Sequence, residues 1–162
     1  MNPYALRFCL LAALLILPGP RLAAEPGAPL PRFASLRASE VNLRAGPGSQ
    51  YPVEWVFLRR SLPIEITAEY GNWRKVRDAD GAEGWVHKSL LTGRRSILVT
   101  GAVRSLRRDP DAASAAVARA EPGVVGRLLV CGGGWCRIEV DGLKGWLPQA
   151  DFWGAYRDEV VE

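Results

Sequence analysis

Apolar and polar residues alternate along the chain in short runs, which is the pattern of half-buried β-strands. The clearest run is LPIEITAEY, in which apolar side chains occupy every second position from Leu62 to Tyr70. VNLR, WRKVR and EGWVH predict further short strands, and DADG at residues 78–81 predicts a tight hairpin turn. Because a barrel closes such a sheet without long exposed edges, the pattern predicts an all-β fold of small barrels.

This pattern occurs twice. LRAGP at 43–47 is followed by LRRDP at 106–110, and GNWRKVRDADGAEGWV at 71–86 is echoed by GGWCRIEVDGLKGWL at 133–147. The shift falls from 63 residues at the first motif to 62 at Trp73 and Trp135 and 61 at Trp85 and Trp146. A period that drifts in this way indicates two diverged copies of one unit with small loop deletions.

The copies differ most in PDAASAAVARAEPG, residues 110–123, where the alanines favour a short helix. The same region of the first copy, PGSQYPVEWVFLRRS, predicts a loop and then a strand. We expect a proline-rich linker at 25–34, a first domain at 35–92, a linker at 93–100 and a second domain at 101–157.

The first residues have the layout of a secretory signal peptide at 1–24, with Arg7, an apolar run and small residues at Ala23 and Ala24. The apolar run is too short to span a bilayer, so we expect no membrane span after cleavage near Ala24. Removing Arg7 and Arg21 lowers the formal net charge from +4 to +2. The signal peptide predicts a periplasmic or secreted protein. A net charge close to zero disfavours nucleic acid as a partner.

Cleavage also removes Cys9 and leaves only Cys131 and Cys136, in CGGGWC. In an oxidising compartment such a pair predicts one disulfide. A metal site would need more ligands, and redox activity is the remaining alternative for this pair. In the first copy Glu69 and Arg74 occupy the aligned positions, so the same hairpin is predicted to be closed by an ion pair there.

The motifs VNLRAGPG, GNWRKV and DGAEGWV resemble the bacterial-type SH3 domain, and the chain from about Ser35 to Gly154 resembles exported proteins with two such domains in tandem. The resemblance implies two small SH3-like β-barrels in tandem that bind peptides or cell-wall material without catalysis. It is better supported in the first copy, because the second has Asp109, Pro110 and Asp111 in place of the Gly-Pro-Gly loop.

Strand parity places the four repeated tryptophans outside the innermost layer of each barrel. The glycines before Trp85 and Trp146 favour packing for those two. The candidate ligand groove therefore consists of Tyr51, Trp55, Tyr70, Trp73 and Trp135, whereas Trp153 is expected to cap the second barrel or to dock it on the first.

The chain offers little catalytic chemistry. His87 is the single histidine, and Asp78 and Asp80 are explained by a turn. Three arginine pairs, at 59–60, 94–95 and 107–108, suit an anionic ligand, but solvated faces balanced by Glu65, Glu69 and Glu83 are the favoured interpretation.

The sequence therefore predicts a non-catalytic binding module of the bacterial envelope with no cofactor and no metal. Its expected ligand is peptidoglycan, a cell-wall peptide or a protein partner. The alternative is an interaction or inhibitor protein for another exported protein, with no cell-wall ligand.

Overall fold

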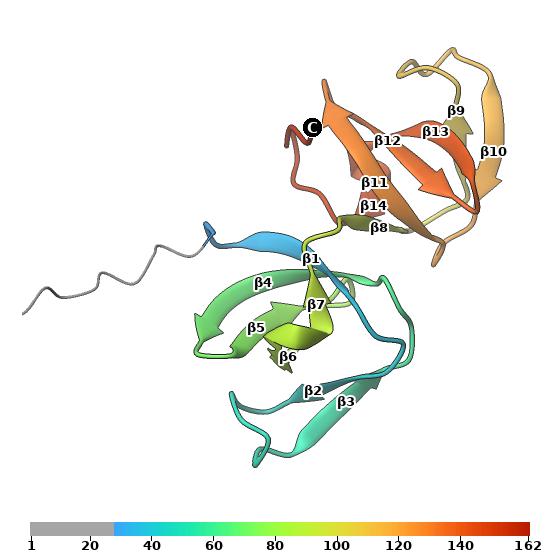
Figure 1. Ribbon diagram of the computed structural model, residues 1–162. Coiled ribbons are helices and arrows are strands. Elements are labelled where there is room, and N and C mark those ends of the chain that lie inside the picture. The colour runs from blue at the N-terminus through green and yellow to red at the C-terminus, as the bar shows by residue number, and fades with distance from the viewer. Residues whose placement is uncertain (1–27) are drawn as a thin grey trace, which may run out of the picture.

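The computed structural model describes residues 28–162, which form two seven-stranded sheets, one from each repeat (Figure 1). The predicted all-β fold of two tandem barrels is confirmed. The signal peptide predicted at 1–24 lies outside the described residues. Among residues 28–162, no helix has the length and apolar character needed to cross a membrane.

The first sheet is antiparallel, in the order β3-β2-β6-β5-β4-β1-β7. Its elements are β1 (Arg32–Leu36), β2 (Val41–Arg44), β3 (Val53–Phe57), β4 (Pro63–Tyr70), β5 (Trp73–Arg77), β6 (Glu83–His87), the 3-10 helix η1 (Lys88–Leu90) and β7 (Leu91–Thr92). Its core contains aliphatic side chains from most strands, among them Leu43, Ile64, Val76 and Val86.

The second sheet repeats this order as β10-β9-β13-β12-β11-β8-β14. Its elements are β8 (Ser96–Val99), β9 (Arg104–Arg107), β10 (Ala116–Ala120), β11 (Val125–Gly132), β12 (Trp135–Val140), β13 (Leu143–Pro148), the 3-10 helix η2 (Gln149–Asp151) and β14 (Phe152–Trp153). Because its strands occupy the same places as those of the first sheet, the repeat in the sequence is also a repeat in the fold.

The structure confirms the strand parity predicted for the tryptophans. Val76, Val86, Ile138 and Leu147 are completely buried. The neighbouring tryptophans of the same strands, Trp73, Trp85, Trp135 and Trp146, are only half-buried. The repeated tryptophans therefore lie outside the innermost layer of each barrel.

Gly84 and Gly145, which precede Trp85 and Trp146, allow two strands to approach closely. A Cβ at Gly84 would lie 2.6 Å from Leu43 Cγ and 2.9 Å from the carbonyl oxygen of Arg44. A Cβ at Gly145 would lie 2.8 Å from Leu106 Cβ. Both positions therefore need glycine for packing rather than for a special backbone angle.

The segment with a predicted short helix, 110–123, is instead a turn followed by β10, so that expectation was wrong. Ala116 to Ala120 pair with β9 through a register shift between Ala116 and Ala118. Sheet pairing here outweighs the helix propensity of alanine, which is a weak local preference.

Both sheets extend into segments that the sequence assigned to linkers. Residues 32–34 belong to β1, which pairs with β4, and residues 96–99 form β8, which pairs with β11 and β14. The chain between the two sheets is therefore only three residues long, 93–95.

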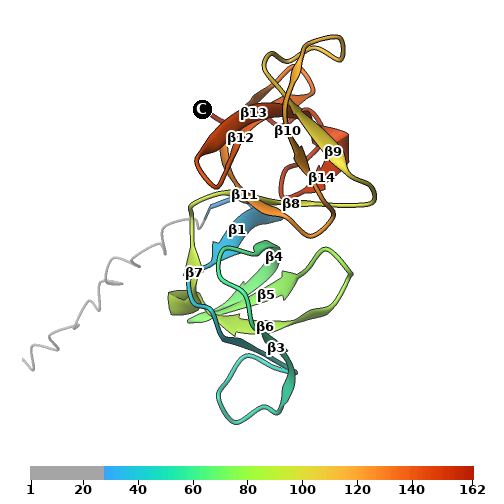
Figure 2. The ribbon, with the colours of Figure 1, turned by 90° about the vertical axis from the view of Figure 1, so that its right-hand side faces the viewer.

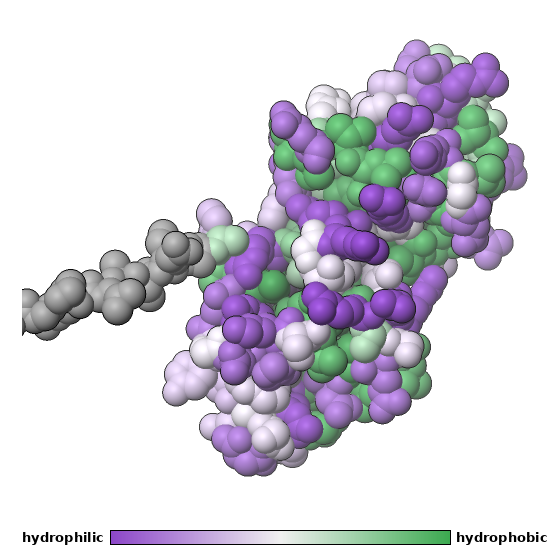
Figure 3. All heavy atoms as spheres, viewed as in Figure 1, coloured by the Kyte–Doolittle hydropathy of each residue, from purple (hydrophilic) through white to green (hydrophobic). Residues whose placement is uncertain are grey.

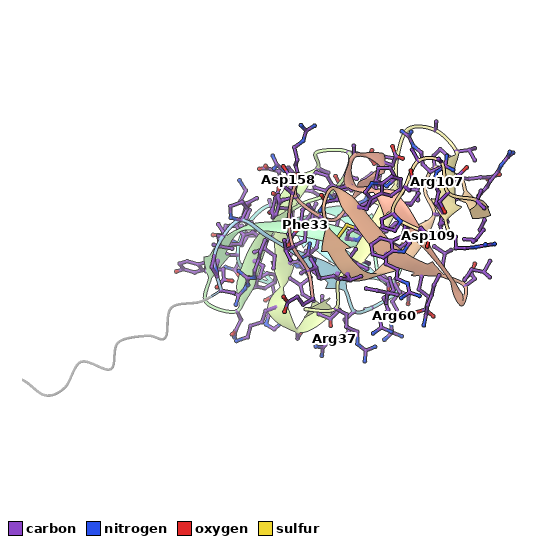
Figure 4. The ribbon with its side chains drawn as sticks, turned by 90° about the horizontal axis from the view of Figure 1, so that it is seen from above. Phe33, Arg37, Arg60, Arg107, Asp109 and Asp158 are labelled. Carbon is purple, nitrogen blue, oxygen red and sulfur yellow. A yellow bond between two sulfur atoms is a disulfide. The ribbon has the colours of Figure 1, made fainter. Side chains whose placement is uncertain are left out.

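An aromatic contact joins the barrels. Between ring centroids, Phe33 of β1 lies 5.0 Å from Trp153, which it meets edge-on, and 4.8 Å from Tyr156, which it meets at a tilt. Figure 4 shows Phe33 at this junction. Trp153 thus docks the second barrel on the first, which is one of the two roles predicted for it.

Polar groups complete the junction. The Tyr156 hydroxyl donates a hydrogen bond to Glu65 Oε1 at 2.8 Å, and the buried hydroxyls of Ser35 and Ser96 lie 2.5 Å apart. Burial, followed by the hydrogen bond to the Glu65 carboxylate, raises the pKa of Tyr156 above its ordinary value. The two barrels therefore share a packed and hydrogen-bonded interface.

Candidate functional site

The first barrel exposes apolar side chains along its edge strand. β3 lies at the end of its sheet and, among the described residues, pairs only with β2. Trp55 is 58% exposed and Leu58, just after the strand, is 75% exposed, and Val53 and Val56 are exposed as well. An edge strand with unpaired backbone groups beside large apolar side chains is suited to receive another extended chain.

The strand β3 itself lies away from the second barrel, and the chain returns to the junction only after Leu58, where Arg59 donates a hydrogen bond to the Gly123 carbonyl oxygen. Figures 1 and 2 show β3 at the end of the first barrel opposite the junction, and Figure 1 shows β2 beside it. The edge is therefore open to a ligand while the barrels stay in contact.

The loop before β3 is held by Arg44. Its Nη1 donates hydrogen bonds to the carbonyl oxygens of Tyr51 at 2.7 Å and Ser49 at 3.1 Å. The Tyr51 ring covers Gly46, where a Cβ would lie 2.5 Å from the ring. The LRAGP motif thus supplies an arginine that fixes the loop and a glycine that makes room for a 40% exposed tyrosine.

A second group of aromatic residues lies on the outer face of the sheet. Directly paired antiparallel residues point to the same face, and Trp73 pairs with both Tyr70 and His87. Two residues along β5, Lys75 pairs with Trp85. These side chains form an outer face that continues through the pairing of Trp85 with Arg44 towards β3.

His87 has a structural role on this face. Its Nδ1 lies 2.7 Å from Ser89 Oγ at the start of η1, and its ring meets Trp73 edge-on at 5.4 Å between centroids. The histidine therefore caps a short helix and packs against a tryptophan.

The structure places the five predicted groove residues in three parts of the molecule. Tyr70 and Trp73 are direct partners at the β4–β5 hairpin, while Tyr51 and Trp55 flank or lie on β3. Trp135 lies in the second barrel at the start of β12.

Trp85, for which the sequence analysis favoured packing, lies between the Tyr70–Trp73 pair and β3. Strand parity predicted that Trp85 points outward, whereas the glycine before it favoured a packing role for the tryptophan. The glycine does serve packing, but the tryptophan beside it stays half-buried.

The second barrel has no comparable apolar edge. Its edge strand β10 has the sequence AVARA, and Val117 is its one exposed large hydrophobic residue. Arg107 fixes the loop before β10 by donating to the Ser114 carbonyl oxygen at 2.6 Å, as Arg44 does in the first barrel. The loop mechanism is therefore repeated, but the exposed aromatic residues are not.

The two cysteines close the β11–β12 hairpin. Cys131 and Cys136 are direct strand partners with a Cα separation of 4.1 Å, and their sulfur atoms lie at disulfide distance. Both residues are buried in the second core. Cys131 also exchanges backbone hydrogen bonds with Val161, so the end of the chain covers the pair.

Asp78 serves the hairpin turn, as predicted. Its Oδ1 accepts hydrogen bonds from the backbone N–H groups of Asp80 at 3.0 Å and Ala82 at 2.8 Å. Within residues 28–162, no group of three or more histidine, cysteine or acidic side chains is placed to hold a metal ion.

The architecture defines a class of protein, a tandem pair of small SH3-like barrels. Two regions, residues 37–93 and 102–154, match the family model described as bacterial SH3 domain. Together these regions make up more than half of the chain, which therefore belongs to the bacterial SH3 domain family.

Two solved structures are similar to the chain. NlpC1 from Trichomonas vaginalis is 13% identical with a TM-score of 0.37, and the match covers 83% of this chain and 49% of that one. An NlpC/P60 family protein from Bacillus cereus ATCC 10987 is 18% identical with a TM-score of 0.35, over 78% of this chain and 57% of that one. The chain thus spans only about half the length of these proteins. No curated protein matches it.

Proposed function

We propose that the chain is a non-catalytic binding module of the bacterial envelope that takes an extended cell-wall peptide on the first barrel. The exposed apolar side chains of the β3 edge carry this proposal. An added peptide strand would pair with the free backbone groups of β3, and its side chains would contact Trp55 and Leu58. The outer face with Tyr70, Trp73 and Trp85 reaches β3 at Val53, the partner of Arg44, and Tyr51 lies in the loop before that strand.

The second barrel has a different part in this proposal. Because its edge is formed largely by alanines and its core holds the cysteine pair, it acts as a support for the first barrel. Trp135 is then a secondary contact, and an export signal at 1–24 would bring the module to the cell wall.

Co-sedimentation with purified cell wall tests the proposal. The chain is expected to pellet with the wall, and Trp55→Ala is expected to weaken binding on the order of tenfold or more, as for an exposed aromatic anchor. Val117→Ala, on the matching edge of the second barrel, is the control and should leave binding unchanged. Absence of co-sedimentation at every salt concentration removes the cell-wall ligand.

The alternative is an interaction or inhibitor protein for another exported protein, which would use the same exposed edge. A pull-down that recovers one stoichiometric protein partner, lost with Trp55→Ala, favours this alternative. Binding to purified wall in the absence of other proteins favours the cell-wall peptide.

A further inference from the structure

A cavity of about 650 Å³ opens at the junction of the two barrels. Five of its twelve lining residues are arginines and none is acidic: Arg37, Arg60, Arg94, Arg95 and Arg127. The volume falls within the range of about 300 to 1,000 Å³ that is usual for small-ligand sites. We call this cavity the arginine cleft.

The arginines of the cleft come from distant parts of the chain. Arg37 follows β1, Arg60 precedes β4, Arg94 lies between β7 and β8, and Arg127 belongs to β11. Figure 4 shows Arg37 and Arg60 on the same side of the molecule. Figure 3 shows hydrophilic side chains along the junction on the face that carries β7. The cleft therefore exists only where the two barrels meet.

Arg95 is a fixed wall of the cleft rather than a free donor. Its guanidinium makes two hydrogen bonds to the Glu159 carboxylate, at 2.7 and 3.0 Å, and one to the Gly154 carbonyl oxygen. It also lies 5.5 Å from the centre of the Phe33 ring. Burial by itself would raise the pKa of Glu159, but the hydrogen bonds from Arg95 and the Tyr156 backbone bring it below its ordinary value.

The other four arginines have no acidic partner of their own. All four are exposed, and none of their guanidinium groups forms an ion pair within 4.0 Å or a hydrogen bond with another residue of 28–162. Arg127 stands opposite Glu139 in the sheet, again without an ion pair.

The acids that the sequence analysis offered as counter-charges are engaged elsewhere. Their partners are Arg77 for Glu65, Arg32 and Arg74 for Glu69, and Lys75 for Glu83. The favoured interpretation of the arginine pairs as balanced faces therefore does not describe Arg60 and Arg94.

We propose that the arginine cleft binds a short peptide that carries two or more carboxylates. Guanidinium groups bind carboxylates through paired hydrogen bonds, and a concave site lined by one sign of charge attracts the opposite charge. The cleft also presents the hydroxyl groups of Ser61 and Thr92 and the apolar residues Leu36 and Val125. These groups suit the amides and carbon chain of a peptide, and inorganic polyphosphate would leave them unused.

This site is independent of the function proposed for the β3 edge. The cleft lies at the junction, its lining contains none of the aromatic residues of that edge, and it recognises carboxylates, whereas the β3 edge would bind peptide backbone and apolar side chains. Loss of cell-wall binding by Trp55→Ala would leave the cleft untouched, so the two proposals fail separately.

A binding experiment with a labelled tetraglutamate peptide and the purified chain tests this proposal. Fluorescence anisotropy measures the binding at low and moderate salt. Tetraglutamine of the same length is the uncharged control, and tripolyphosphate is the phosphate arm. The double variant Arg60→Gln with Arg94→Gln removes one donor beside β4 and one between the barrels. The matched variant Arg108→Gln with Arg119→Gln removes the same charge from exposed positions outside the cleft.

The expected result is saturable binding of tetraglutamate, no binding of tetraglutamine, and a loss on the order of tenfold or more in the Arg60/Arg94 variant. The Arg108/Arg119 variant should bind within about twofold of the parent protein. A variant with lysine at both cleft positions keeps the charge and should lie between the two. Circular dichroism of each variant confirms that the fold is intact.

Three results would overturn the proposal. Equal losses in the two glutamine variants would show attraction by net charge alone. Undiminished binding in the Arg60/Arg94 variant would place the peptide elsewhere. Binding of tripolyphosphate without tetraglutamate would assign the cleft to phosphate groups.

Discussion

The two barrels close the same hairpin with different chemistry. In the first, the direct strand partners Glu69 and Arg74 form an ion pair at 3.1 Å, and Glu69 also binds Arg32 of β1. In the second, the matching partners are Cys131 and Cys136, which are buried and at disulfide distance. One backbone arrangement thus accepts either a partly exposed ion pair or a covalent link, and the link suits a hairpin that packs into the core.

The barrels also differ at their edge strands, and the barrel with the weaker hairpin closure has the more apolar edge. The first barrel has the weaker hairpin closure and an apolar edge that remains exposed at β3. The second has the stronger closure and an edge composed largely of small residues at β10. In the proposed function one copy carries the ligand surface while the other supplies stability, and the following predictions test how stability differs between the two copies.

Removal of both cysteines should have the largest effect. Replacing Cys131 and Cys136 by serine is expected to lower the free energy of unfolding of the second barrel by about 2 to 4 kcal/mol. The loss combines chain entropy with two hydroxyl groups placed in a buried core. Hydrogen exchange measured by mass spectrometry reports each barrel separately, and faster exchange confined to residues of the second barrel is expected. An equal rise in both barrels would contradict two independent cores.

The close strand contacts at Gly84 and Gly145 should respond alike. Gly84→Ala is expected to cost about 1 to 3 kcal/mol, because its Cβ would meet Leu43 Cγ and the Arg44 carbonyl oxygen. Gly145→Ala should cost somewhat less, because its nearest contact is 2.8 Å rather than 2.6 Å. Chemical denaturation of the two variants measures the difference. As a control, Gly132→Ala has no atom near its Cβ and should cost little.

Tyr156→Phe tests the junction between the barrels. Loss of the hydrogen bond to Glu65 is expected to cost about 1 to 2 kcal/mol, and Arg77 still pairs with that carboxylate. The raised pKa of Tyr156 means that the neutral phenol stabilises the folded state. This stabilisation is complete below the ordinary pKa of about 10 and is lost as pH rises through the raised value.

Denaturation across alkaline pH measures this contribution. The stability of the parent protein should fall above about pH 10 more steeply than that of the Tyr156→Phe variant. Parallel curves for the two proteins would contradict the role assigned to the phenol.

A disulfide introduced at the β4–β5 hairpin of the first barrel should have the smallest effect on stability. Glu69→Cys with Arg74→Cys places two cysteines at directly paired positions, as in the second barrel. The disulfide should add about 2 kcal/mol, and the lost ion pairs should remove up to about 1 kcal/mol of that gain. Thermal melts with and without reductant measure the net change, and stability that does not depend on reductant would show that the two hairpins are not equivalent.

Much of the fold follows from short-range sequence patterns. Alternation in LPIEITAEY predicted β4, the spacing of the repeated motifs predicted two matching sheets, and their alignment paired Glu69 with Arg74 and Cys131 with Cys136. These features were predictable because strand parity and hairpin register depend on neighbouring residues. The helix expected at 110–123 was wrong because its alanines belong to β10, and pairing with β9 outweighs the weak helix propensity of alanine.

The candidate sites were also predictable only in part from the sequence. The sequence by itself determined which residue types were available, including Trp55 on a strand and arginine pairs at 59–60 and 94–95. Only the tertiary structure decided that β3 is an exposed edge and that Arg37, Arg60, Arg94 and Arg127 line one cleft. These residues are far apart in the chain, and they meet because each barrel closes on itself and Phe33, Trp153 and Tyr156 then pack the barrels together. Such contacts depend on the arrangement of whole sheets, which residue spacing does not encode.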